Sequence, residues 1–133
     1  MSNLLEYANE MWMYGSKGRH PWRSLHSFEK IVEGIWFASS FANMTLIDGG
    51  TELLVIDPGA TNNEEKKFNQ IKQQFPDIPF RGIVFTHGHH DHCFGAERYI
   101  KEAKSKEWDS PDIFAHKLIV ERFMRYDKTA KFN

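Results

Sequence analysis

The stretch Thr86–His92, which reads Thr-His-Gly-His-His-Asp-His, constrains this chain more than any other part of the sequence. Four imidazoles and one carboxylate fall within six residues of it. It follows the apolar run Gly82–Phe85, which is rich in β-formers and comes shortly after Pro79, so we expect a buried strand that leads into a polar loop. Open α/β sheets place their ligands at the carboxyl ends of strands. The pattern therefore predicts a metal-binding loop.

The spacing within this loop has a physical reason. Alternate side chains of an extended segment share a face, so His87, His89 and Asp91 can point the same way. Gly88 has no Cβ where the chain must bend tightly around an ion. We expect His92 to turn back toward the same cavity as the chain enters a helix. A cloning tag would be a run of consecutive histidines at a terminus, which this interrupted set in mid-chain is not.

The ligand types indicate the metal. Neutral imidazole nitrogens and carboxylate oxygens suit zinc, although similar loops also accept manganese or iron. His87 with His89 can begin one site, and Asp91 with His92 a second. Two neighbouring metals would hold a bridging hydroxide and clamp an ester or amide under attack. The sequence thus predicts a metal-dependent hydrolase that uses a zinc-bound hydroxide, in which Asp91 also has a catalytic role by orienting that hydroxide.

The remaining histidines and the single cysteine have simpler interpretations. His90 lies on the opposite face of the loop, which favours an exposed or supporting residue over a ligand. Cys93 follows His92 and could perturb the metal site, but a small buried residue is the favoured interpretation. His20 and His26 have no ligand partners near them in sequence, so we expect ordinary surface or packing residues.

Composition narrows the class of protein. A length of 133 residues suits one modest domain, and 41% hydrophobic with 14% aromatic residues is ample for a packed core. The formal charge of −1 implies neither nucleic acid nor an anionic membrane as partner. One cysteine excludes an internal disulfide and fits a reducing compartment. With no signal peptide or membrane-spanning run in the sequence, we expect a cytoplasmic protein that acts on a small-molecule ester.

Hydrophobic periodicity predicts an α/β fold with two parts. Residues 1–27 form an amphipathic helix and an irregular connection, and residues 28–133 form the main domain. The predicted elements are a helix over 3–14, strands over 28–32, 35–38, 44–48 and 52–57, a helix from Asn62 or Asn63 to Phe75, a strand over 82–85, a helix over 95–104, a strand over 113–115 and a helix over 118–124. The consecutive apolar residues Leu53–Ile56 predict a strand buried on both faces.

These residues resemble a known family. Thr86–His92 is similar to the T-H-x-H-x-D-H signature of the metallo-β-lactamase-fold hydrolases, and Leu54–Gly59 resembles the strand-turn that carries a buried aspartate below the metal site. The resemblance covers residues 28–120 and implies the first half of an αββα sandwich, a mixed sheet backed by helices. It implies that His87 and His89 bind a first zinc, that Asp91 and His92 bind a second, and that Asp57 supports the site from behind.

Within the superfamily, Ala42–Ile47 resembles the alkylsulfatase branch, which cleaves alkyl sulfate esters with two zincs. Cys93–Ala96 departs from that branch, which has an aromatic residue and paired glycines there. A lactone, a thioester or a phosphodiester are alternative substrates in the same fold. Four ligands cannot close two tetrahedral sites, and the resemblance places the others in a second half that this sequence lacks. His116 could in principle approach the cavity. The alternative to an enzyme is an incomplete half-domain that binds metal weakly and needs a complementary chain or a second copy.

Overall fold

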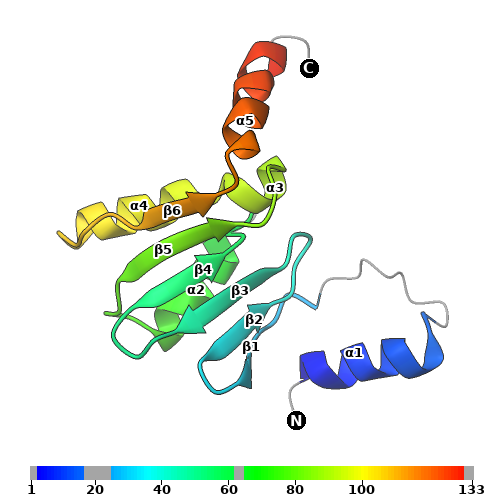
Figure 1. The fold of residues 1–133 in the computed structure, drawn as a ribbon. Coiled ribbons are helices and arrows are strands. Elements are labelled where there is room, and N and C mark those ends of the chain that lie inside the picture. The colour runs from blue at the N-terminus through cyan, green and yellow to red at the C-terminus, as the bar shows by residue number, and fades with distance from the viewer. Residues whose placement is uncertain (1–2, 17–24, 62–64, 131–133) are drawn as a thin grey trace.

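The computed structural model describes residues 3–16, 25–61 and 65–130, which form one six-stranded sheet with helices around it (Figure 1). Strands β1 (Phe28–Val32), β2 (Ile35–Ala38), β3 (Met44–Asp48), β4 (Leu53–Ile56), β5 (Phe80–Phe85) and β6 (Asp112–Ala115) lie in the sheet in this order. The helices are α1 (Asn3–Tyr14), α2 (Glu65–Gln74), α3 (His90–Cys93), α4 (Ala96–Ser105) and α5 (Leu118–Thr129).

The strand directions change halfway across the sheet. β1 to β4 form an antiparallel meander joined by short turns, whereas β5 is parallel to β4 and β6 is parallel to β5. Parallel neighbours need a crossover, which α2 supplies between β4 and β5, and α3 with α4 supply between β5 and β6. The carboxyl ends of β4, β5 and β6 therefore meet at one edge of the sheet. The loop that follows β5 begins there.

One face of the sheet carries the core. Helices α2 and α4 cover this face (Figure 1), and Phe68 and Ile71 of α2 and Tyr99 of α4 are buried against the strands. The ring of Tyr99 meets Phe80 edge-on at a centroid distance of 4.7 Å and Phe68 at 5.3 Å. The helical spacing of these apolar residues agrees with the sequence prediction. The expected cap at Asn62 or Asn63 lies outside the described residues.

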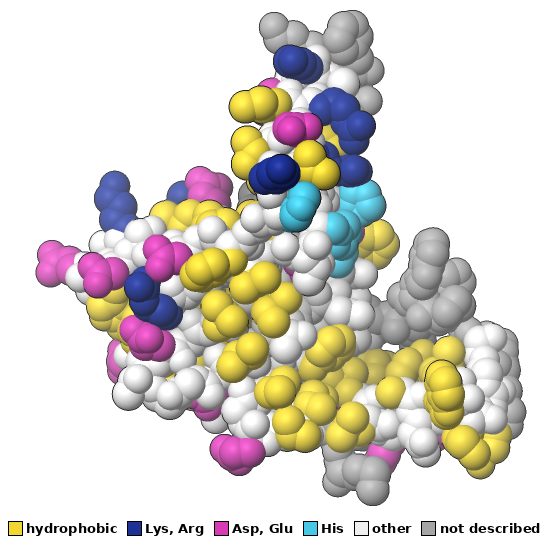
Figure 2. Space-filling view, viewed as in Figure 1, with side chains coloured by type: hydrophobic (Ala, Val, Ile, Leu, Met, Phe, Trp, Pro, Cys, Tyr) yellow, Lys and Arg dark blue, Asp and Glu magenta, His cyan; other side chains and the backbone are white. Residues whose placement is uncertain are grey.

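The other face of the sheet is open, and here one prediction is wrong. Leu53 and Val55 of β4 are almost fully buried, but Leu54 and Ile56, on the opposite face, are only half-buried. Figure 2 shows hydrophobic side chains gathered on this open face. Leu54 contributes to them together with Phe114, which is 54% exposed. The strand is not buried on both faces because α1 meets this face at β1 and β2, where its Leu4 amide donates to Oε2 of Glu29 at 3.2 Å. Within the described residues, this contact leaves Leu54 half-buried and Phe114 exposed.

The predicted element order is correct, with one addition in the metal loop. The loop was expected to stay extended as far as Asp91, but the short helix α3 begins at His90. Only His87 and His89 therefore keep the alternating pattern. Among the described residues, no helix has the length and apolar character that crossing a bilayer requires.

Candidate metal centre

The site forms where the carboxyl ends of β4 and β5 lie side by side. Asp57 follows β4, and its amide donates to the carbonyl oxygen of Val84 in β5 at 2.9 Å. This bond places the Asp57 side chain beside Thr86, the first residue after β5. Asp57 has a left-handed backbone with φ of 54°, an uncommon conformation that aspartate tolerates better than most residues. The turn Asp57-Pro58-Gly59 thus delivers a carboxylate under the loop.

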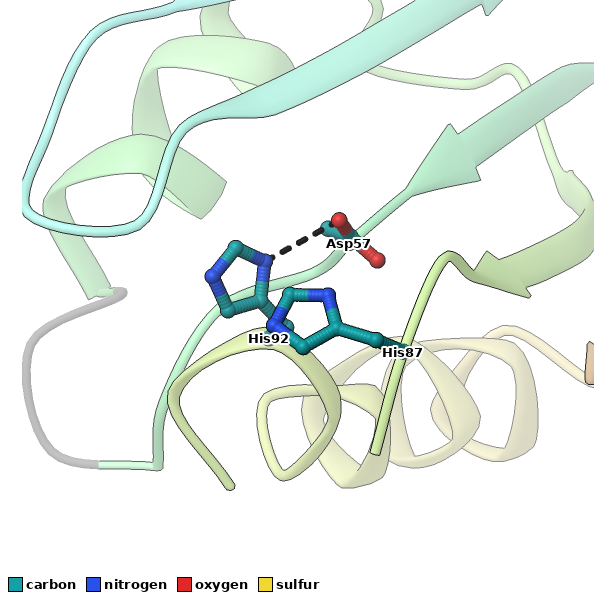
Figure 3. A group of neighbouring side chains, drawn as sticks. All are labelled: Asp57, His87 and His92. Carbon is teal, nitrogen blue, oxygen red and sulfur yellow. Dashed lines mark hydrogen bonds and ion pairs between the residues drawn. The ribbon is translucent and has the colours of Figure 1, made fainter. Parts of the chain in front are cut away.

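The Asp57 carboxylate is buried and fully engaged. Its Oδ1 accepts a hydrogen bond from the Thr86 amide at 2.8 Å, and its Oδ2 accepts one from the Thr86 hydroxyl at 2.5 Å. Oδ2 also lies 3.0 Å from Nδ1 of His92, which the dashed line in Figure 3 marks. Three donors around one carboxylate fix the loop on both sides of the predicted ligands. The support from behind that the family resemblance implied for Asp57 agrees with this geometry.

The same contacts determine which ring nitrogens face the site. The Thr86 hydroxyl uses its proton on Asp57, so its oxygen is left to accept from Nδ1 of His87, 3.0 Å away. Nδ1 of His92 donates to Asp57 in the same way. Both imidazoles then carry a lone pair on Nε2, which is the state that a metal ligand needs.

The predicted ligands lie together in two pairs. Nε2 of His87 is 3.0 Å from Nδ1 of His89, and Nε2 of His92 is 3.8 Å from Oδ2 of Asp91. Two nitrogens on one tetrahedral zinc are about 3.3 Å apart, given bonds of about 2.05 Å. The first pair is close to that separation. Ligand atoms of Asp57, His87 and His92 also lie within 4.8 Å of one another, and Figure 3 shows these side chains converging.

The charge state of His89 suits a cation site. Desolvation, and then the positive charge of Arg122, lower the pKa of His89 from its ordinary value, with His87 and His92 acting in the same direction. The imidazole is therefore neutral over a wider pH range than an isolated one. The donor set of neutral imidazoles and carboxylates fits a divalent metal such as zinc.

The other histidines lie apart from these pairs. The His90 side chain is exposed and faces the rings of Phe94 and Tyr126, at centroid distances of 6.2 and 6.5 Å. His116 accepts a hydrogen bond on Nδ1 from the Leu118 amide at 3.3 Å, which occupies one of its two nitrogens at the start of α5. His26 lines the same cavity as Asp91, and it does not belong to the cluster that Asp57, His87 and His92 form among the described residues. His20 lies outside the described residues.

Cys93 and Gly95 account for the packing of the loop where it departs from the alkylsulfatase pattern. Cys93 is a buried free thiol, as expected, and donates to the carbonyl oxygen of His87 at 3.0 Å. Burial, with Asp57 and Asp91 nearby, raises the pKa of this thiol to about 12. Gly95 lies against the Pro58–Gly59 turn, where its amide donates to the carbonyl oxygen of Gly59 at 2.7 Å. Glycine is needed there because any Cβ would lie 2.5 Å from the Pro58 oxygen.

Two cavities end at Asp91. One has a volume of about 410 Å³ and lies between the 39–42 loop and α2, and the other has about 530 Å³ and lies between that loop and α1. Asp91 lines both cavities. Sequence reasoning missed Arg122, which approaches the loop from α5. The helical spacing of Ile119, Arg122 and Tyr126 places them on one face of α5, but it does not show that this face meets the loop.

Comparison with known proteins agrees with this geometry. The sequence model of the metallo-beta-lactamase superfamily matches residues 39–122. The alkyl/aryl-sulfatase BDS1 of Saccharomyces cerevisiae is 27% identical over 108 residues, which cover 76% of this chain and 17% of that protein. The structure of the sec-alkylsulfatase Pisa1 from Pseudomonas sp. is 25% identical with a TM-score of 0.56, over 72% of this chain and 16% of that one. This chain therefore spans under a fifth of the length of these sulfatases.

A structure of lower identity shows the fold alone. A metallo-beta-lactamase from Cronobacter sakazakii is 18% identical with a TM-score of 0.60, over 78% of this chain and 36% of that one. The TM-score above 0.5 shows that the two chains share the same fold over the matched part. Since the family match covers well over half of the sequence, and the sheet and the His/Asp loop agree with it, this chain belongs to the metallo-beta-lactamase superfamily of metal-dependent hydrolases.

Proposed function

We propose that this chain carries the metal-binding half of a hydrolase that cleaves alkyl sulfate esters, with zinc as its cofactor. The observation that carries the proposal is the pairing of His87 with His89 and of Asp91 with His92 above the buried carboxylate of Asp57. The similarity to two proteins named as alkylsulfatases supports the choice of substrate. A lactone, a thioester or a phosphodiester are the competing substrates.

Each residue has a defined role in this proposal. A zinc ion held by these side chains supplies Lewis acidity, which polarises the ester and lowers the pKa of a water molecule. His87 and His89 hold one ion, and Asp91 and His92 a second. Asp57 fixes the ring of His92 through its Nδ1 and leaves Nε2 for the metal. Asp91 also accepts a hydrogen bond from the attacking water and so aims it at the ester.

Turnover by the zinc-loaded chain tests this proposal. Release of sulfate from a medium-chain alkyl sulfate is followed by ion chromatography for the wild type and for Asp91→Ala. We expect the substitution to lower the rate at least about 100-fold, since it removes a ligand and the group that orients water. Asp48→Ala, at the end of β3, is the matched control and keeps the rate. An Asp91→Ala protein that retains both metal and turnover would sink the proposal.

A second candidate is favoured by the open face of the sheet. A half-domain that binds metal but needs a complementary chain, or a second copy, would use this face to complete a sandwich. Ile47 of β3 pairs with Leu54 of β4, and both project to the face that also carries Phe114. Buried apolar contact on this face is the driving force for assembly. The four ligands from one loop also leave two tetrahedral sites unfilled.

The molecular mass in solution, measured by light scattering, distinguishes the two candidates. A half-domain should form dimers or larger species, and the Phe114→Asp variant should contain a larger fraction of monomer. Phe41→Asp is the control, because Phe41 is 77% exposed on a loop away from the sheet face. A zinc-loaded monomer that turns over substrate unaided would exclude the half-domain.

A further inference from the structure

A third cavity lies on the α5 side of the metal loop. It has a volume of about 560 Å³ and is lined by His87 and Gly88 of the loop, by His116, and by Arg122 and Arg125 of α5. His87 thus borders this cavity and also belongs to the metal cluster. A ligand in this cavity would therefore lie beside a residue of the metal cluster.

Arg122 is held against the metal loop by a relay through Tyr126. Its Nε donates to the Tyr126 hydroxyl at 2.8 Å, and that hydroxyl donates to the carbonyl oxygen of Gly88 at 3.1 Å. The guanidinium also lies over the Tyr126 ring, 5.5 Å from its centroid. Its stem fills the space beside Gly88, where a Cβ would lie 2.8 Å from the Arg122 Cδ. These contacts fix the side chain through Nε and leave its two terminal nitrogens for another partner.

The positive charge here exceeds the negative charge. Arg122 and Arg125 are one turn apart on α5, and within the described part of the chain neither forms an ion pair with a carboxylate. Glu121 also lines the cavity, which sets one carboxylate against two guanidinium groups. Figure 2 shows the Lys and Arg side chains gathered beside the histidines at the base of α5. Like charges held this close together favour an anionic ligand between them.

We infer that this cavity is a subsite for the tetrahedral oxyanion of the substrate, a sulfate or phosphate group, bound by Arg122 and Arg125 next to the metal ligand His87. The inference rests on the hydrolase proposed above and narrows its substrate to a charged ester. The planar guanidinium group binds such oxyanions in a bidentate manner. A lactone or a thioester carries no such group and would leave both arginines without a role.

Anion binding to the full chain tests the subsite independently of turnover. The wild type is titrated with sodium sulfate, and separately with phosphate, at constant ionic strength and with zinc present. Signals of the arginine Nε–H groups in NMR spectra report on the subsite itself. We expect the Arg122 and Arg125 signals to shift with millimolar sulfate. Arg125→Gln should weaken binding about tenfold or more, because it removes one charge-assisted contact.

Matched variants distinguish sulfate binding at this subsite from non-specific attraction of the anion to the positively charged helix α5. Lys128→Gln removes one charge from the last turn of α5, outside the cavity, and should change the affinity by less than about twofold. Arg125→Lys keeps the charge but loses the planar fork, so its affinity should fall between those of the wild type and Arg125→Gln. Arg122→Gln also removes a packing contact, so its folding is checked by the NMR spectrum before it is compared.

The outcomes distinguish the two proposals. Unshifted arginine signals at saturating sulfate, or equal losses in Arg125→Gln and Lys128→Gln, would overturn the subsite even if the chain proves to be a hydrolase. Arginine-dependent binding in a chain that has no turnover would support the subsite and favour the half-domain over a chain that hydrolyses its substrate unaided. If phosphate binds at least about tenfold more tightly than sulfate, the subsite stands and the substrate is a phosphate ester.

Discussion

Asp57 is the residue on which the whole site depends. One buried carboxylate accepts hydrogen bonds from the amide and hydroxyl of Thr86 and from the ring of His92. It therefore fixes the start and the end of the six-residue ligand segment together. The sequence indicated this role only through the family resemblance, because no local pattern shows that the end of β4 lies beside the end of β5.

The Asp57→Asn variant tests this dependence. The asparagine side chain keeps the shape of aspartate but replaces one carboxylate oxygen by an NH2 group. That group faces a hydrogen-bond donor of Thr86 or His92, so one hydrogen bond is replaced by two donors that face each other. We expect zinc affinity to fall about 10-fold to 100-fold and the free energy of unfolding to fall by about 1–3 kcal/mol. Equilibrium dialysis and urea denaturation measure the two effects. Asp48→Asn, whose carboxylate caps the exposed Gly50 amide, should leave both unchanged; equal effects in the two variants would contradict the account.

Cys93 is a packing residue in spite of its position beside His92. It is 2% exposed, and burial together with the nearby carboxylates raises the pKa of its thiol to about 12. The reactive thiolate is therefore scarce in the folded protein at pH 8. We expect an aromatic disulfide reagent to react at least about 100-fold more slowly with the folded chain than with the chain in guanidinium. Similar rates in the two conditions would show that the thiol is accessible.

Among the elements, the contact between the Asp57–Gly59 turn and the start of α4 positions the loop most strongly. Gly95 precedes α4 with a helical backbone, φ of −68°, so alanine there carries no dihedral penalty. Its Cβ would nevertheless meet the backbone oxygen of Pro58 at 2.5 Å. Both partners in this contact are backbone, which cannot move aside as a flexible side chain can. The start of α4 therefore has to lie directly against the Pro58–Gly59 turn.

A pair of glycine-to-alanine variants tests this contact. Gly95→Ala should lower the free energy of unfolding by about 2 kcal/mol or more, as overpacking against a fixed backbone does. In Gly88→Ala the one close contact is with the Arg122 Cδ at 2.8 Å, since the other neighbouring atoms lie at 3.5 Å. The Arg122 side chain is flexible and can shift, so this variant should cost under about 1 kcal/mol. Urea denaturation of both gives the comparison. A smaller loss in Gly95→Ala than in Gly88→Ala would show that the loop adjusts freely at its α4 end.

The helices and strands could be predicted from the sequence because their signals are local. Apolar periodicity located α2 and α4 through Phe68, Ile71 and Tyr99, and the glycine-bearing turns located the β-hairpins. The short helix α3 was missed because four residues are too few for a periodic pattern. Arg122 was missed because its place beside Gly88 depends on how α5 folds back onto the loop, which is a tertiary contact.

At the scale of the whole molecule, the layers explain why the site is open. Helices α2 and α4 cover one face of the sheet, and the other face leaves Phe114 exposed and Leu54 half-buried. The four predicted ligands could be singled out because they lie within six residues of one another. Any further ligand that completes the metal shell must reach the same end of the sheet as the Thr86–His92 loop. The two similar sulfatases are several times longer than this chain. The matched regions cover 72% and 76% of this chain.

The central claim is that the Thr86–His92 loop holds a divalent metal, and zinc content per chain tests it most directly. Protein purified without chelator is dialysed against micromolar zinc and measured by elemental mass spectrometry, beside His87→Ala and the control His90→Ala. We predict about one zinc or more per wild-type chain, retained in His90→Ala and lost in His87→Ala. A zinc content near zero in the wild type, or the same zinc content in all three proteins, would contradict the claim that this loop holds the metal.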